Sequence, residues 1–127
     1  MSKPLRWFQV RNWDGTLWNF FASTHGISPE LRGDPGTRGY NGVTIPDKKI
    51  VIIDSSSTRY VQDHTVLHEA MHMSVDGVPG LDGAAEERVI TEMAPRLYPI
   101  LKRFGLHWPE RPEGFESLER KSRRQSR

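Results

Sequence analysis

Cysteine is absent from the sequence, and this absence removes several chemistries at once. Disulfide bonds, thiolate zinc sites, iron–sulfur clusters and cysteine nucleophiles are all excluded. Any metal ion in this protein must therefore be held by histidine, aspartate or glutamate side chains.

Long apolar runs are missing as well. Residues 1–8 lack the apolar core of about 7 to 15 residues that a secretory signal needs, and nowhere do about 18 apolar residues follow one another. The hydrophobic share is only 35%, with 11 glycines and 9 prolines, which predicts a loop-rich chain with a small core. We therefore expect a soluble, cytoplasmic protein without a membrane partner, whose small core would gain stability from a bound ion.

A strong excess of either charge is also lacking, because 18 basic residues face 16 acidic ones. Five of the basic groups lie in residues 117–127 beside one acid, so the rest of the chain holds 13 basic and 15 acidic residues. This distribution disfavours nucleic-acid binding by the folded body. The basic end can contact nucleic acid or an acidic partner, although most such ends are solvated charge runs.

The length of 127 residues is that of one ordinary domain. We predict a single domain over residues 1–108. Residues 109–127, polar and then basic, are predicted to form a disordered tail. We expect the protein to be a monomer.

Four short apolar runs, separated by turn residues, predict four strands in two pairs. They are Leu5–Val10, Leu17–Phe21, Gly42–Ile45 and Lys49–Asp54. The turn pair Asp14-Gly15 favours a hairpin for the first two, although a short helix over Leu17–Ser23 fits the pattern nearly as well. We predict Ile50–Asp54 as the edge strand of the sheet, with a buried central position as the alternative.

Two helices are predicted in the second half of the chain. The first runs over Ser57–Val75 and ends at Gly77, and the second runs over Ala84–Phe104. Pro95 and Pro99 lie inside the second helix, so we expect a kink or a break there.

The strongest signal is the pentapeptide His68-Glu69-Ala70-Met71-His72 in the middle of the first predicted helix. Residues four apart lie on one face of a helix, so both imidazoles can bind the same ion. Glu69 lies beside them and can take the proton from an attacking water without being a ligand. The pattern therefore predicts a hydrolytic zinc site with His68 and His72 as ligands and Glu69 as the base.

With this motif the chain resembles the zincin-type metallopeptidases, in particular small gluzincin-like proteins of bacteria and phages. The resemblance covers residues 42–104: a strand, the motif helix and a following helix that begins with acids. It implies a minimal zincin-like α+β fold, with a small antiparallel sheet packed on the HExxH helix and a second, glutamate-bearing helix. It also implies one Zn²⁺ ion held by His68, His72 and a glutamate of that second helix, and peptide-bond hydrolysis with Glu69 as general base and proton shuttle.

The extended metzincin spacing is excluded as the source of the third ligand. It would need glycine at position 75 and histidine or aspartate at position 78, and both residues are valine. The remaining acidic candidates are Glu86, Glu87 and Glu92, with Asp76 and Asp82 as weaker options.

A helical wheel of the second helix favours Glu86 as the third ligand. At 100° per residue from Val89, Glu86 lies at about 60°, close to the centre of the apolar residues, whereas Glu87 lies at about 160° and Glu92 at about 300°. A carboxylate directed into an apolar face needs a partner or an ion. Glu87 and Glu92 stay open as alternatives, since Glu92 matches the longer gap of larger gluzincins and Glu87 can orient a ligand histidine.

Four further side chains were weighed for the site. His64 lies one turn before His68. It is either an alternative metal ligand, a residue that orients a ligand, or an ordinary surface histidine of the helix. His107 can donate to a developing oxyanion or simply pack on its neighbouring tryptophan; Tyr60 and Tyr98 are weaker candidates. The four tryptophans are expected to fill or cap the core: Trp7, Trp13, Trp18 and Trp108.

The sequence thus predicts a zinc metallopeptidase with a peptide or protein substrate. A second hypothesis is a catalytically inactive zinc-binding domain of the same fold that acts as an interaction or regulatory module. A metal-dependent nuclease or deaminase is disfavoured because it needs a different ligand set.

Overall fold

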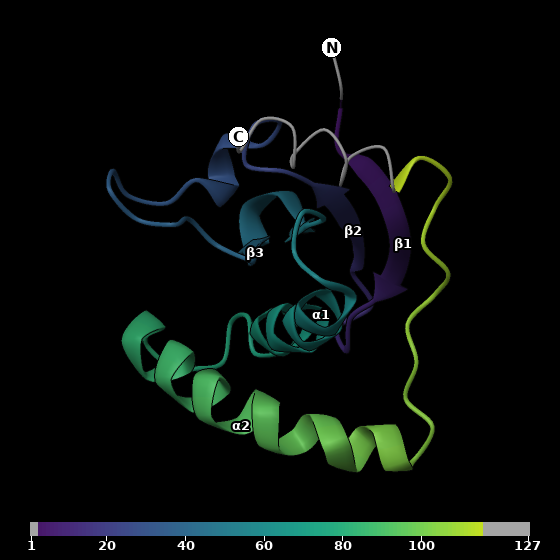
Figure 1. Ribbon diagram of the computed structural model, residues 1–127. Helices are drawn as coiled ribbons and strands as arrows, with labels where there is room; N and C mark the ends of the chain where they lie inside the picture. The colour runs from purple at the N-terminus through teal and green to yellow at the C-terminus, as the bar shows by residue number, and fades with distance from the viewer. Residues whose placement is uncertain (1–2, 116–127) are drawn as a thin grey trace.

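A four-stranded sheet, one helix packed against it and a second helix outside the first form three layers in the computed structural model (Figure 1). The structure describes residues 3–115. The strands are β1 (Leu5–Arg11), β2 (Leu17–Ser23), β3 (Gly42–Ile45) and β4 (Ile50–Asp54). The helices are α1 (Arg59–Ser74) and α2 (Gly83–Arg103), with short 3-10 helices η1 (Pro29–Leu31) and η2 (Pro46–Lys48). The predicted α+β class is confirmed.

The sheet has the strand order β1-β2-β4-β3 and is mixed, where an antiparallel sheet was expected. β1 pairs with β2 and β3 pairs with β4 in the antiparallel sense, but β2 and β4 run parallel. The prediction of Ile50–Asp54 as the edge strand is also wrong, because β4 lies between β2 and β3. Val51, Ile52 and Ile53 are all buried, so both faces of β4 are covered, as expected of an interior strand.

The first hairpin forms as predicted, and the alternative helix over Leu17–Ser23 does not. Gly15 has a φ of 88°, which a glycine adopts without steric cost, and the side chain of Asp14 accepts hydrogen bonds from the backbone N–H and hydroxyl of Thr16. The turn chemistry therefore fixes the hairpin locally.

The core lies between the sheet and α1. Phe20, Val51 and Ile53 on the sheet pack with Val66 and Met73 of the helix. Among the tryptophans, Trp7 and Trp18 are buried in this core and Trp108 packs against it, whereas Trp13 is exposed.

Both predicted helices are present and have side-chain caps. Thr58 accepts a hydrogen bond from the backbone N–H of Val61 at the start of α1, and Asp82 accepts one from Ala85 at the start of α2. None of the helices among residues 3–115 combines the length and apolar character that crossing a membrane requires.

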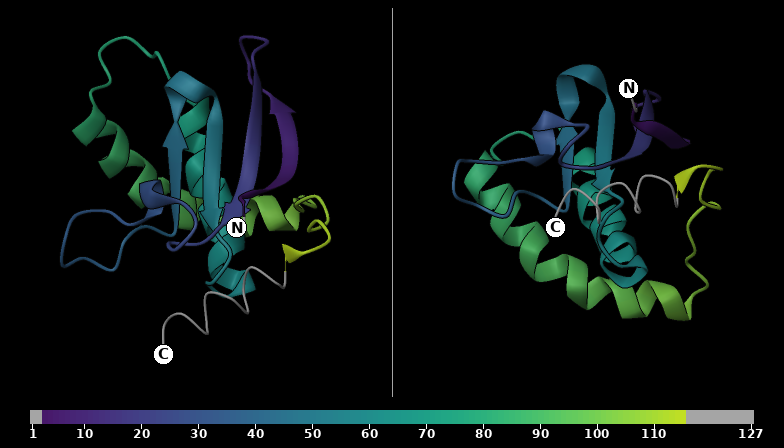
Figure 2. Two further views of the ribbon diagram at one scale, coloured as in Figure 1. Left: turned by 90° about the horizontal axis from the view of Figure 1, so that it is seen from above. Right: turned by 45° about the horizontal axis from the view of Figure 1, so that its top comes forward.

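Helix α2 is continuous through both of its prolines, so the expected break does not occur. Instead α2 curves around α1 (Figures 1 and 2). Pro95 and Pro99 have no N–H to donate, and the loss of two helical hydrogen bonds accounts for the curvature.

After α2 the chain returns to the sheet, and the packed domain extends beyond the predicted boundary at residue 108 (Figure 1). The indole N–H of Trp7 donates to the carbonyl of Pro109 at 3.0 Å. Arg111 donates to the side-chain oxygen of Gln62 and pairs with Asp63. Phe115 is buried in the core. The basic end, residues 117–127, lies outside the described residues.

Candidate metal centre

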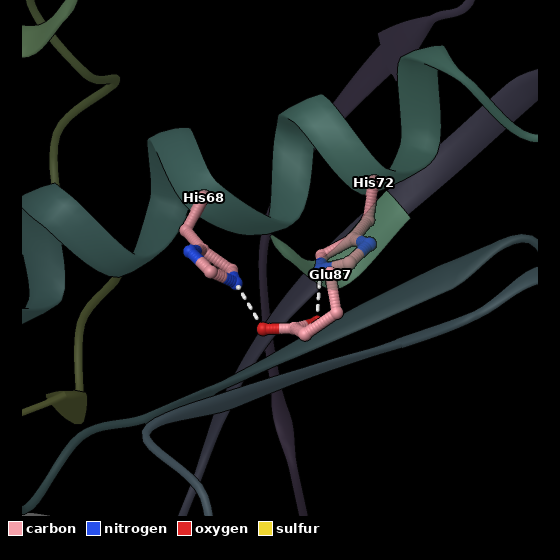
Figure 3. Close-up of side chains that lie close together, drawn as sticks. All are labelled: His68, His72 and Glu87. Carbon is pink, nitrogen blue, oxygen red and sulfur yellow. Dashed lines mark ion pairs between the residues drawn. The ribbon is translucent and has the colours of Figure 1, made fainter. Parts of the chain in front are cut away.

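The two motif histidines point from α1 toward one carboxylate of α2, that of Glu87 (Figure 3). Nε2 of His68 lies 3.2 Å from one Glu87 oxygen, and Nε2 of His72 lies 2.8 Å from the other. Each of the three residues offers one ligand-type atom, and these atoms lie within 4.8 Å of one another. The fold therefore brings two imidazole nitrogens and one carboxylate close to a single point.

This donor set fits a zinc ion. Two neutral imidazoles and one carboxylate are the ligands of many catalytic zinc sites, which keep a fourth position open. Ligand atoms at about 2.0–2.1 Å from a tetrahedral ion are roughly 3.3 Å from one another, so small side-chain shifts would bring these three residues around an ion.

The favoured third ligand, Glu86, occupies a different place from the one expected. Its carboxylate lies 2.6 Å from Nδ1 of His72, on the opposite edge of the ring from the Nε2 that faces Glu87. The geometry thus favours Glu87, the alternative, for the third ligand. Glu92 pairs with Arg96 on an exposed part of α2 and does not approach the histidines.

The apolar residues of α2 do not mark its buried face, because half of the residues that defined the predicted apolar face are exposed. Met93, Ile100 and Phe104 are 48%, 52% and 82% exposed, whereas Ile90 and Ala94 are buried against α1. The buried face is therefore rotated toward Glu87 from the centre of the full apolar set.

Glu86 orients one of the two histidines. Because a carboxylate accepts, Nδ1–H of His72 donates to Glu86, while Nε2 of the same ring faces the Glu87 carboxylate. With Nδ1–H held by Glu86, Nε2 would be the nitrogen that binds an ion. Among residues 3–115 no carboxylate holds Nδ1 of His68 in this way. The orienting role considered for Glu87 in the sequence thus falls to its neighbour.

Glu69 lies beside this cluster and is almost completely buried, with 6% of its surface exposed. The hydroxyl of Thr44 on β3 donates to its Oε1 at 2.9 Å, and its Oε2 lies 4.0 Å from Nε2 of His68. Burial raises the pKa of the Glu69 carboxyl, and the Thr44 hydrogen bond and the two histidines oppose that rise. One oxygen is held in place while the other faces the cluster.

Strand β3 approaches α1 closely at Gly42, which the sequence did not single out. A Cβ atom at this position would lie 2.6 Å from Cγ2 of Thr65 and 3.0 Å from Cγ of Glu69. Glycine therefore lets the strand reach the helix, and this brings Thr44 within hydrogen-bond distance of Glu69. The only signal in the sequence is a glycine at the start of a predicted strand.

A groove of about 1040 Å³ runs between β3, α1 and α2. His68, His72, Glu69 and Glu87 all line it, together with Gly42 and other residues of β3. The centre is therefore accessible to a ligand along the outer strand of the sheet.

The free edge of β3 borders this groove. Asp54 donates its backbone N–H to the carbonyl of Asn41, which fixes the alternation of hydrogen-bonded pairs along β3 and β4. In an antiparallel pair only every second residue bonds to the neighbouring strand, so the backbone groups of Gly42 and Thr44 point away from β4. They are available to an additional strand.

The remaining sequence candidates divide between the groove and the outer surface. His64 lines the groove and stacks on Tyr98, with ring centroids 3.8 Å apart, while the ring of Tyr60 lies 4.4 Å away at a tilt of 44°. Burial, then Asp63 and Tyr60, raise the pKa of Tyr98. His107 is exposed and bonds to the carbonyl of Gly105, outside the residues that line the groove. The structure thus does not bring this oxyanion candidate to the site.

In comparisons with known proteins, no protein-family model, curated protein or solved structure matched the chain. The case for a function therefore depends on the geometry of the site.

Proposed function

We propose that this protein is a zinc-dependent metallopeptidase of the zincin type. One observation carries the proposal: His68, His72 and Glu87 converge from two helices beside a buried carboxylate, Glu69, in an open groove. The HExxH spacing and the geometry point independently to the same chemistry. The family assignment, zinc as the metal and the peptide substrate belong to this proposal.

Glu69 is placed to act as the general base. A zinc ion, when bound, would supply Lewis-acid chemistry that lowers the pKa of a water and polarises the substrate carbonyl. Thr44 fixes one oxygen of Glu69, and the other faces the ligand cluster, where it can accept a proton. Burial raises the pKa of Glu69, and this makes its carboxylate a stronger base.

The substrate would bind as an extended chain along β3. The free backbone groups of Gly42 and Thr44 can pair with a peptide in the manner of an added strand, and this would place its main chain beside Glu69. This role belongs to β3, since β4, to which the sequence assigned it, lies inside the sheet.

The inactive zinc-binding domain is the second candidate. A structural zinc site is usually closed by four protein ligands and has no use for a buried carboxylate next to the ion. Glu69, held by Thr44 at the side of an open groove, therefore favours catalysis over a purely structural ion.

The test measures zinc content and peptide cleavage on the same samples. We expect about one zinc per chain in the wild type and in Glu69→Gln, and far less in His68→Ala and His72→Ala. Glu92→Gln is the matched control, since Glu92 lies on the same helix as Glu87 but away from the site. Equal zinc content in His68→Ala and the wild type would remove the proposed centre.

Cleavage is followed by mass spectrometry on a mixed library of unstructured peptides. The wild type and Glu92→Gln should cut, whereas Glu69→Gln should bind zinc and fail to cut. Undiminished cleavage by Glu69→Gln contradicts the proposed base. A zinc-loaded wild type that leaves every peptide intact supports the interaction module instead.

A further inference from the structure

Helix α2 carries a stripe of exposed apolar side chains on its solvent side, formed by Val89, Met93, Ile100 and Phe104. Their exposures are 45%, 48%, 52% and 82%. At 100° per residue the four lie within about 60° of one another, so they form one continuous stripe. Four large apolar residues grouped on one helix face indicate an interaction surface, because scattered exposed residues would need no explanation.

No segment among residues 3–115 covers this stripe. Among residues 3–115, α2 packs on α1 through its other face, which contains the buried Ile90 and Ala94. The residues beyond them, 116–127, include a single large apolar side chain, Leu118, among charged and polar ones. The stripe is thus open to a second molecule within the described structure.

The spacing of the stripe makes it complementary to itself. Val89 and Phe104 are equally far from the midpoint between residues 96 and 97, and so are Met93 and Ile100. A two-fold axis at that midpoint, perpendicular to the helix, would place Val89 of one copy opposite Phe104 of the other and Met93 opposite Ile100. Each apolar side chain would then meet another apolar side chain.

The charges beside the stripe follow the same symmetry. On the wheel Glu92 and Arg103 lie on the same flank, at about 300° and 320°. In an antiparallel helix pair with two-fold symmetry, the same side of each helix lies next to the same side of the other. Glu92 of each copy would therefore approach Arg103 of the other copy, and the symmetry produces this contact twice. Arg96 lies near the axis, and its ion pair with Glu92 at 3.4 Å reduces the repulsion between the two copies of Arg96.

We propose that α2 pairs with α2 of a second copy of this chain in an antiparallel, two-fold homodimer, in place of the monomer expected from the sequence. The pairing leaves most of the α2 side of the groove open, because Glu87, Thr91 and Pro95 line the groove and lie on the wheel at about 160°, 200° and 240°. Glu86, which also lines the groove, lies at about 60° on the wheel, but it precedes the stripe and contacts His72. A single helix pair buries no more than the ~1,200 Å² at the small end of specific interfaces. The dimer therefore belongs with the small interfaces of weak, transient complexes.

Sedimentation velocity of the full chain over a range from about 1 to several hundred micromolar tests the proposal. The mass should rise with concentration from 14.6 kDa toward twice that value. The double substitution Met93→Glu/Ile100→Glu should keep the protein monomeric throughout, since both side chains are half exposed and the fold does not need them. Circular dichroism and thermal melting verify that this variant is folded.

Val78→Glu is the matched control, because Val78 is 44% exposed but lies outside α2. It should dimerise like the wild type. Arg103→Glu should weaken association by about five- to tenfold, since two exposed ion pairs are lost and each contributes little. The charge swap Glu92→Arg/Arg103→Glu should recover most of that loss.

A wild type that stays monomeric at every concentration overturns the proposal. A dimer that survives Met93→Glu/Ile100→Glu, or that Val78→Glu disrupts, places the interface elsewhere and also overturns it. Binding of a monomeric wild type to vesicles with anionic lipid, lost in the double variant, would assign the stripe to a membrane surface instead.

Discussion

The two histidines of the motif lie on the same face of the same helix, yet their surroundings differ. A Glu86 oxygen lies 2.6 Å from Nδ1 of His72, whereas among residues 3–115 no carboxylate contacts Nδ1 of His68. The exposed fractions of the two side chains follow the same order, with 12% for His72 and 25% for His68. The spacing of a motif thus shows which side chains share a target, but the neighbouring helix decides which of them is oriented in advance.

The largest expected effect is the loss of the carboxylate that faces both histidines. Glu87→Ala should reduce zinc affinity more than any other change on α2. It removes the third ligand itself and leaves the two imidazoles without a negatively charged partner. Zinc affinity is measured by competition with a chromophoric chelator. If Glu86→Ala loses more affinity than Glu87→Ala, the ligand assignment between the two glutamates is reversed.

A smaller effect should follow when His72 is made to resemble His68. Glu86→Gln keeps the size of the side chain but removes the charge behind the ring, and a loss of about 10- to 100-fold in zinc affinity is expected. Glu92→Gln serves as the control with unchanged affinity. Equal affinities in Glu86→Gln and the wild type would show that the negative charge beside Nδ1 does not strengthen zinc binding.

The approach of β3 to the helix can be disturbed without touching a ligand. Gly42→Ala places a Cβ too close to Thr65 and Glu69, and overpacking of this kind costs about 1–3 kcal/mol in the free energy of unfolding. Urea denaturation of the metal-free protein measures it, with Gly83→Ala as a comparison, because Gly83 is not in the positive-φ region and a Cβ there meets no atom within 4 Å. If Gly42→Ala is no less stable than Gly83→Ala, the close contact is absent in solution.

The smallest effect concerns the hydroxyl that holds the base. Thr44→Val removes one hydrogen bond to Glu69 while keeping the shape of the side chain, and a loss of about 1 kcal/mol in stability is expected. Zinc content should not change, since Thr44 touches no ligand. Chemical denaturation and metal analysis on the same sample test both statements, and loss of zinc would tie Thr44 to the ligands themselves.

Much of the fold follows from local patterns. The hairpin at Asp14-Gly15 and the boundaries of both helices depend on turn and capping chemistry within a few residues, and these predictions were correct or nearly so. The parallel pairing of β2 with β4 was not predictable, because no local pattern specifies which distant strands become neighbours.

The site shows the same division. The placement of His68, Glu69 and His72 near one another follows from helical periodicity alone. The choice between Glu86 and Glu87 depends on which apolar residues of α2 are buried, and composition cannot decide that. The hydrogen bond from Thr44 joins a strand and a helix 25 residues apart, so only the packed structure reveals it.

The outer position of α2 has a consequence for the stability of the domain. Its packing within the described structure is chiefly on α1, with no extensive contact to the sheet, so it is the layer with the fewest neighbours. An ion bound by His68 and His72 of α1 and by Glu87 of α2 would cross-link the two helices. Filling the centre would then slow the opening of the outer helix, so the wall of the groove would be more rigid with the ion bound than without it.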